Sequence, residues 1–264
     1  MTDFNRRKFL GTAAASAALT ARVLAAQQDS QLEAPFRGNK SWRPLLNGVD
    51  LSGWHSELGW HGVPGRVEWF TTTAVAWSGA NPKMLGATAA PGGIIVNGIE
   101  THTTNLVADR KFGDIELYAE FMVSKDSNSG VYLHGLYEVQ ILDSYGKPEP
   151  MKYFDGGGIY EQVDKNNKGF GGTPPRVNAC RPPGEWQYYH IWFRAPRFNS
   201  AGQKTGDATF IKVIYNGRVV HENVTSGSPT RSALELPEAS VNPIMLQGDH
   251  GPVAFRNIYF RPLR

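Results

Sequence analysis

The sequence predicts an all-β protein built from two packed sheets, and three observations support this. Short apolar and aromatic runs recur at fairly even spacing along the chain from Ser41 onward. Clusters of Gly, Pro, Asn and Asp separate these runs, and no long stretch carries the apolar stripe of an amphipathic helix. Because there is no internal repeat and no linker, a single two-sheet jelly-roll sandwich is the simplest architecture.

The expected strands follow from the same runs. Residues 215–218 read "YNGR", and the Asn-Gly pair predicts a tight type I′ hairpin between two of the strands. The runs that we expect to form strands are residues 68–77, 93–97, 115–123, 130–135, 137–143, 188–195, 209–222 and 253–263.

Alternation along these strands predicts one apolar face and one polar face. In residues 137–143, Tyr137, Val139 and Ile141 point one way, so Glu138 and Gln140 point the other way. The polar faces are rich in His, Glu, Gln, Tyr and Trp rather than in Lys, Thr and Ser. Aromatic rings between a few acids and imidazoles are typical of a sugar-binding surface. We expect His134 to share the face of Glu138 and Gln140.

The first 26 residues have the layout of an export signal. Arg6, Arg7 and Lys8 precede an Ala-rich apolar stretch that is too short for a membrane span. The run "NRRKFLG" resembles a twin-arginine signal, which predicts a periplasmic protein. Residues 27–40 read as a polar leader, and residues 41–264 as one β-sandwich domain.

Charge and cysteine content narrow the function classes. The chain has 27 basic and 24 acidic residues, but without residues 1–26 each sign counts 23. We therefore expect no nucleic-acid partner, which would need a clustered basic surface. The single cysteine, Cys180, cannot form an internal disulfide, and no neighbouring base marks it as a nucleophile.

Seven segments together resemble the 3-keto-disaccharide hydrolase family. They occur in order over nearly the whole chain after the signal, and they are residues 42–54, 128–135, 137–143, 157–160, 182–191, 215–220 and 245–263. The resemblance implies a concanavalin A-like, laminin G-like jelly roll that agrees with the strand pattern. It also implies cleavage of glycosides whose sugar is oxidised at C3, with the sugar bound on the concave sheet face.

Such a reaction needs a base, an acid and a positive group or metal. A ketone at C3 acidifies the C2 proton, and loss of that proton allows expulsion of the C1 oxygen. Glu138 is our first candidate for the base, because burial beside aromatic rings would raise its pKa. His134, His250 and Arg256 complete the set of candidate catalytic residues, and Arg256 could pair with Glu138 or polarise the ketone.

The remaining polar residues of the matched segments are candidates for substrate binding or metal binding. Asp143 could bind substrate, orient His134 or simply begin a turn. A divalent ion is a candidate cofactor with His134, Glu138 and Asp143 as ligands, although no spaced metal motif is present. The candidate substrate-binding residues are Gln140, Asp143, Gln247, Asp249, Asn128, Tyr132, His190 and Trp192.

Two other functions stay open at the level of sequence. A non-catalytic carbohydrate-binding module fits the fold, since fold alone does not decide function. An ordinary retaining β-glycosidase fits less well. Its usual pair of carboxylates would need an acid where Gln140 stands, and the last acid is the shorter Asp143.

Overall fold

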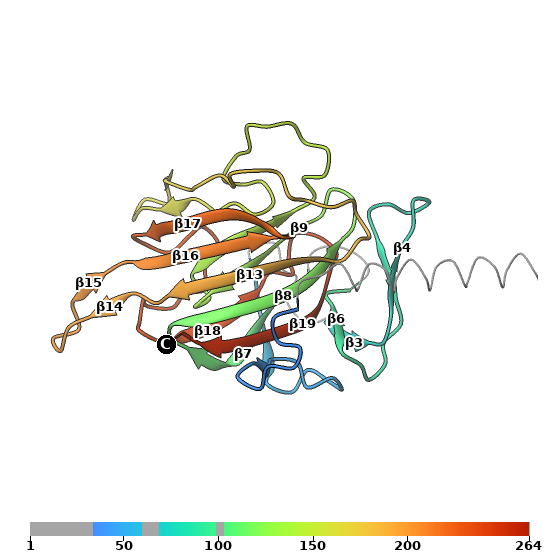
Figure 1. The fold of residues 1–264 in the computed structure, drawn as a ribbon, viewed down its shortest axis with the longest axis horizontal. Coiled ribbons are helices and arrows are strands. Elements are labelled where there is room, and N and C mark those ends of the chain that lie inside the picture. The colour runs from blue at the N-terminus through green and yellow to red at the C-terminus, as the bar shows by residue number, and fades with distance from the viewer. Residues whose placement is uncertain (1–33, 60–68, 99–102, 264) are drawn as a thin grey trace, which may run out of the picture. The chain divides into compact units, whose positions relative to one another are not determined.

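In this computed structural model the described residues are 34–59, 69–98 and 103–263, and they build two antiparallel sheets. The expected export signal, residues 1–26, lies outside them. In Figure 1 the arrows of β17, β16, β13, β8 and β19 lie side by side in the larger sheet. Its full order is β17 (Arg218–Ser226), β16 (Ala208–Tyr215), β13 (Gln187–Arg194), β8 (Ile115–Val123), β19 (Val253–Pro262), β6 (Ile94–Val96) and β3 (Phe70–Thr72), with β1 (Arg43–Pro44) paired to β19.

The smaller sheet has five strands. Its order is β10 (Tyr137–Leu142), β9 (Asn128–Leu133), β18 (Asn242–Leu246), β7 (Asn105–Phe112) and β2 (Trp54–Glu57). Three two-stranded ribbons complete the described elements: β4 (Val75–Trp77) with β5 (Leu85–Ala87), β11 (Gln162–Val163) with β12 (Gly169–Phe170), and β14 (Arg197–Phe198) with β15 (Lys204–Gly206).

The fold is the predicted all-β, two-sheet jelly-roll sandwich. Every regular element in the described ranges is a strand, and none of these residues forms a helix long and apolar enough to cross a membrane. The predicted hairpin is confirmed, because Tyr215 pairs with Arg218 while Asn216 and Gly217 have φ of 47° and 80°.

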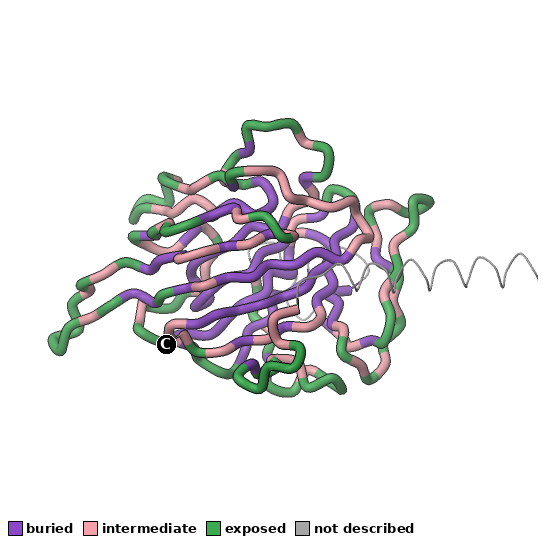
Figure 2. Tube along the Cα trace, viewed as in Figure 1, coloured by how far each residue is buried: buried purple, intermediate pink, exposed green. Residues whose placement is uncertain are grey.

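The predicted apolar faces form the core between the two sheets. Side chains from β8 of the larger sheet and from β9 and β10 of the smaller sheet belong to one buried cluster, and Figure 2 shows these strands as almost wholly buried. The members that the alternation pattern predicted include Leu117, Ala119, Phe121, Val123, Val131, Leu133, Val139 and Ile141.

The outward face of the larger sheet is partly covered. Phe36 stacks on Tyr259 with ring centroids 3.8 Å apart, whereas Glu116, Trp192 and Arg261 line a hollow of about 700 Å³ on the same face. Glu116 is 2% exposed and accepts hydrogen bonds from His190 Nε2 at 2.8 Å and Arg261 Nε at 2.6 Å. The buried carboxylate of Glu116 is therefore paired with two nitrogen donors.

Candidate active site on the smaller sheet

A hollow over Gly130 forms the floor of the candidate site. Gly130 of β9 pairs with Gln140 of β10, and on its other side its carbonyl accepts a bond from Gln247 N at 3.0 Å. A Cβ atom at Gly130 would lie only 2.2 Å from Oε1 of Glu138. The carboxyl of Glu138 therefore occupies the space that any other residue at position 130 would fill.

The cavity above this floor opens on the outward face of the smaller sheet. Its volume is about 60 Å³, which is room for roughly two water molecules at about 30 Å³ each. Its lining comes from β9, β10, the turn after β18 and two covering segments, namely Asn128, Tyr132, Glu138, Gln140, Tyr160, Arg231, Ser232, Gln247 and His250.

Glu138 contributes the carboxyl group of this cavity, and the pKa of that group lies well above its usual value. It is 2% exposed, and burial raises the pKa of its carboxyl to about 8, with a smaller contribution from the negative charge of Asp249. The hydroxyl of Tyr132 opposes this shift by donating a hydrogen bond to Oε2 at 2.8 Å. The carboxyl is therefore mostly protonated at neutral pH and becomes a strong base when it ionises.

The segment 157–160 covers the free edge of β10 and brings Tyr160 to the cavity. Gln140 N donates to Gly158 O and Gly157 N donates to Gln140 O, both at 2.8 Å. Tyr160 N then donates to Glu138 O at 3.3 Å. Burial and the nearby charge of Glu138 raise the pKa of the Tyr160 phenol, so its hydroxyl stays a donor at neutral pH.

A second covering segment supplies the positive charge at the cavity. Thr230 accepts a hydrogen bond from Glu138 N at 3.1 Å, which holds this segment against β10. Arg231, the next residue, donates from Nε to Glu161 Oε1 at 2.6 Å and also lines the cavity. Its guanidinium is thus fixed near Glu138 by a partner outside the cavity.

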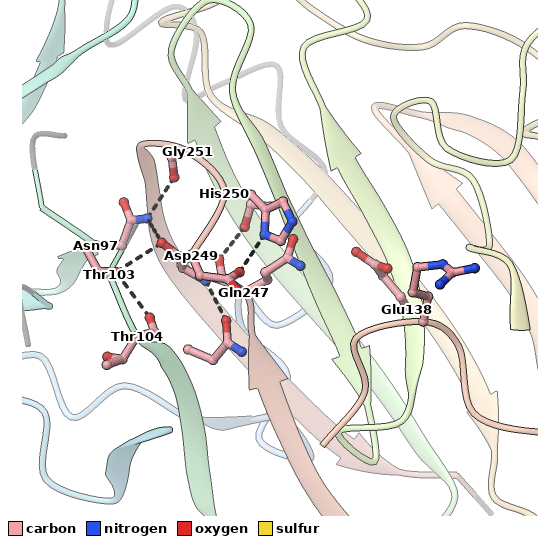
Figure 3. Close-up of polar contacts among 12 residues, drawn as sticks. Asn97, Thr103, Thr104, Glu138, Gln247, Asp249, His250 and Gly251 are labelled. Carbon is pink, nitrogen blue, oxygen red and sulfur yellow. Dashed lines mark hydrogen bonds and ion pairs between the residues drawn. The ribbon is translucent and has the colours of Figure 1, made fainter. Parts of the chain in front are cut away.

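The turn after β18 carries Gln247, Asp249 and His250, and Figure 3 shows the bonds that hold it. Asn97 Nδ2 donates to Gly248 O at 2.9 Å and to Gly251 O at 2.8 Å. His250 Nδ1 lies 2.6 Å from Oδ1 of the buried Asp249. An aspartate that orients an imidazole in this way prepares it for proton transfer.

Three amide oxygens of the cavity have no hydrogen-bond partner among the described residues. They are Asn128 Oδ1, Gln140 Oε1 and Gln247 Oε1, and each atom is buried. Buried acceptors without a protein donor are rare in folded proteins, and they mark where water or a ligand pairs with the cavity wall. The site therefore combines a perturbed carboxyl, an imidazole, a guanidinium and several empty acceptors.

Comparison with known proteins gives this site its context. The family model described as the 3-keto-alpha-glucoside-1,2-lyase-like domain matches residues 41–261. The chain belongs to this family. The matched range contains every residue that lines the cavity.

Solved structures support the fold. A candidate glycosyl hydrolase from Parabacteroides distasonis is 28% identical, with 85% of this chain and 84% of that chain covered and a TM-score of 0.58. A second candidate glycosyl hydrolase from the same organism is 15% identical, with 88% and 98% covered and a TM-score of 0.53. No curated protein matches the chain. The family and the 28% identical structure together make it a carbohydrate-active protein.

Within this family member, the structure brings together many of the residues expected from sequence. One cavity is lined by six of them, and Asp249 contacts one of these, His250, from behind. The six are Asn128, Tyr132, Glu138, Gln140, Gln247 and His250. Tyr160, Arg231 and Ser232 were not anticipated. Tyr160 stands in the matched segment 157–160, so a signal for it existed, whereas Arg231 and Ser232 lie in no matched segment.

The expected placement of His134 is wrong. His134 has a φ of 59°, so the strand alternation ends before it. Its Nε2 lies 3.3 Å from Gly113 O, and its ring contacts Phe193 of the core at a centroid distance of 5.2 Å. Burial lowers the pKa of its imidazole. His134 is thus packed at the edge of the sandwich and does not line the cavity.

The sequence prediction also assigned three residues of the larger sheet to the site. They are Arg256, His190 and Trp192. Arg256 Nε donates to Glu120 at 2.6 Å rather than to Glu138. His190 donates to Glu116 and stacks on Trp192 with centroids 3.9 Å apart. Alternation identified polar faces correctly but could not show that two such faces lie on opposite sides of the sandwich.

Asp143 stands at a turn. Its carboxylate accepts bonds from Asp126 N at 3.0 Å and Tyr145 N at 3.3 Å. The three candidate metal ligands therefore lie in three separate places: His134 against the core, Glu138 in the cavity and Asp143 at a turn. Over the residues that the structure describes, no group of three or more His, Cys, Asp or Glu side chains is arranged to hold a metal ion.

Proposed function

We propose that this protein cleaves 3-keto-glycosides by elimination at the oxidised sugar. The observation that carries the proposal is the buried Glu138 carboxyl with its pKa near 8, next to an imidazole and a guanidinium. Its family, 3-keto-alpha-glucoside-1,2-lyase-like, supports this choice of chemistry. A cavity of about 60 Å³ is too small to enclose a sugar ring, so the reacting edge of the ring would enter it.

In the proposed reaction, ionised Glu138 removes the proton from C2 of the 3-keto sugar. The electron pair of that C–H bond forms the enolate, whose negative charge rests on the ketone oxygen. The enolate then reforms the ketone with a C1–C2 double bond while the C1–O bond breaks. His250, whose Nδ1 lies 2.6 Å from Asp249 Oδ1, donates a proton to the departing oxygen. Addition of water to the double bond yields the free keto-sugar.

The developing enolate needs a positive group or hydrogen-bond donors. Arg231 and the Tyr160 hydroxyl are the residues of this cavity suited to that task. Arg231 takes the role that sequence analysis gave to Arg256. Because Glu161 holds its Nε, the guanidinium is positioned before substrate binds.

The test is aglycone release from an aryl 3-keto-glucoside and its unoxidised parent, in both anomers, with and without EDTA. We expect release from the keto form alone. Glu138→Gln should abolish release and keep binding, while Glu222→Gln on the exposed edge strand β17 serves as a control with unchanged activity. Release from the parent would assign an ordinary glycosidase, and binding without release would assign a carbohydrate-binding module. Inhibition by EDTA would add a metal to the reaction.

We also propose export through the twin-arginine route, on the basis of the "NRRKFLG" run and the apolar stretch that follows it. Arg6→Lys and Arg7→Lys together should leave the uncleaved precursor in the cytoplasmic fraction of a bacterial host. Normal processing and export of the double variant would contradict this proposal.

A further inference from the structure

We propose that the three unpaired amide oxygens form an acceptor cluster that binds hydroxyl groups of the sugar and thereby turns its ketone toward Arg231 and Tyr160. The acceptor cluster consists of Asn128 Oδ1, Gln140 Oε1 and Gln247 Oε1. The inference rests on the proposed function, because it assumes that the cavity takes the oxidised sugar. The substrate class that follows is an oxidised sugar whose ring carries free, adjacent hydroxyl groups beside the reacting carbon.

Strand register places the cluster around one hollow. Gln140 and Gln247 flank Gly130 on its two sides, and neighbouring strands lie about 4.8 Å apart. Asn128 is two residues before Gly130 on β9 and therefore shares its face. Since Gly130 has no side chain, the three amides surround the Glu138 carboxyl and the cavity beside it rather than one another.

The orientation of one amide is fixed by the protein itself. Gln140 Nε2 donates to Phe154 O at 3.2 Å, so turning the amide over would lose that bond and place its oxygen against another acceptor. Gln140 is 2% exposed and Gln247 is 4% exposed, so these oxygens are reached only through the cavity, by water in the free protein or by a ligand.

The chemistry of the cluster selects the group that it binds. Amide oxygens accept hydrogen bonds, and sugar hydroxyls donate them. A ketone oxygen only accepts, so it is repelled by the cluster and fits instead against the donors Arg231 and Tyr160. This orientation brings the ketone to the groups that stabilise the enolate and leaves the hydroxyls on the side of Gly130.

The decisive variant is Gln247→Met, which keeps the length of the side chain and removes one unpaired acceptor. The dissociation constant of an aryl 3-keto-glucoside, measured by calorimetry in the non-reacting Glu138→Gln background, should rise roughly 10- to 100-fold. The melting temperature of the ligand-free protein should not fall, because no hydrogen bond from the protein to this oxygen is lost. A fall in melting temperature, or an unchanged dissociation constant, would overturn the proposal.

Gln187→Met is the matched control. Gln187 is a buried glutamine whose Oε1 accepts from Tyr215 Oη at 2.6 Å and from Arg181 N at 2.9 Å. Although Gln187 Nε2 has no partner among the described residues, the same substitution removes every bond that Oε1 accepts and should lower the melting temperature. A rise in melting temperature at both positions would show that methionine stabilises any site and would overturn the assignment of unpaired oxygens.

A cation could also satisfy the cluster, and a separate titration distinguishes it. EDTA-treated protein is titrated with calcium, magnesium or manganese chloride in the absence of sugar. We expect no change in melting temperature that depends on Gln247; a rise that Gln247→Met abolishes would assign the cluster to a cation and overturn the sugar assignment.

Methyl glucoside, an unoxidised glucoside, separates this inference from the proposed reaction. If wild-type protein releases aglycone from keto-glucosides but Gln247→Met binds them normally, the inference fails and the function stands. If no release occurs but binding of methyl glucoside depends on Gln247, the reaction fails and the acceptor cluster stands.

Discussion

The carboxyl of Glu138 lies under opposing influences that set its chemistry. Burial and the charge of Asp249 raise its pKa, whereas the hydrogen bond from Tyr132 lowers it, and the balance is a pKa of about 8. A carboxylate with this pKa is a far stronger base than an exposed glutamate. The structure thus explains why a single buried acid can act on a carbon-bound proton near neutral pH.

This pKa predicts the pH dependence of the reaction. A base must be ionised to accept a proton, so kcat/KM for a 3-keto-glucoside should increase with pH over the range in which Glu138 ionises, near pH 8. Because His250 donates a proton in the same reaction, a falling limb at higher pH belongs to the acid. The pH–rate profile of the free enzyme checks this, and a profile without any rise between pH 6 and pH 8 would assign a different base.

The same shift predicts how stability depends on pH. Glu138 binds its proton more tightly in the folded chain than in the unfolded chain, with a pKa of about 8 against 4.5. Stability from this group is therefore complete below pH 4.5 and is lost as pH rises through 8. Glu138→Gln should match wild type near pH 4.5 and exceed it above pH 8, by on the order of 4 kcal/mol. Urea unfolding at both pH values measures the difference, and an equal difference at both would contradict the buried ionisation.

The sequence predicted only some of the residues that make up the candidate site. Glu138, Gln140 and His250 stood in matched segments with alternating polarity, so sequence could group them. His134 was grouped with them in error because its left-handed backbone conformation is not visible in a pattern of period two. Arg231 could not be found, since a single arginine in a covering segment carries no periodic signal.

At the scale of elements, the site depends on three neighbouring strands and the turn after β18. Sequence analysis located β9 and β10 but did not anticipate β2, β7 and β18. In β7 the charged run Asp109–Lys111 interrupts the apolar pattern, and β18 contains Pro243. β2, β7 and β18 form because each pairs with a neighbouring strand. Strand propensity and local alternation carry no information about those partners.

Gly130 gives a prediction at this scale. Gly130→Ala would place a Cβ atom 2.2 Å from Glu138 Oε1 and push the carboxyl out of the hollow. We expect kcat/KM to fall at least 10-fold with the fold retained, because the end of the glutamate side chain can move. Gly86→Ala is the control, since a Cβ atom there meets nothing closer than 3.7 Å. Equal activities of the two variants would contradict the role given to the hollow.

At the scale of the whole described fold, two polar faces serve different purposes. On the outward face of the larger sheet the buried carboxylates are paired with arginines, whereas the outward face of the smaller sheet has amide oxygens without a protein partner around a cavity. Sequence predicted the jelly roll and its apolar core because both follow from alternation and turn residues. It could not decide which polar face binds sugar, since that depends on which segments cover each sheet.

Arg256 tests this division of the two faces. Arg256 pairs with Glu120, which is 1% exposed, so Arg256→Gln leaves a buried carboxylate without its cation. We expect a loss of about 3 kcal/mol in unfolding free energy and unchanged kcat and KM below the melting temperature. A selective loss of kcat at unchanged stability would return Arg256 to the catalytic site.

The central claim is that cleavage begins with removal of the C2 proton by Glu138. The most direct measurement is the isotope effect on aglycone release from a 3-keto-glucoside carrying deuterium at C2. The account predicts a clear slowing of kcat/KM by deuterium in the wild-type protein and no detectable release by Glu138→Gln. Release at equal rates from the protiated and deuterated substrates, with Glu138→Gln still active, would contradict it.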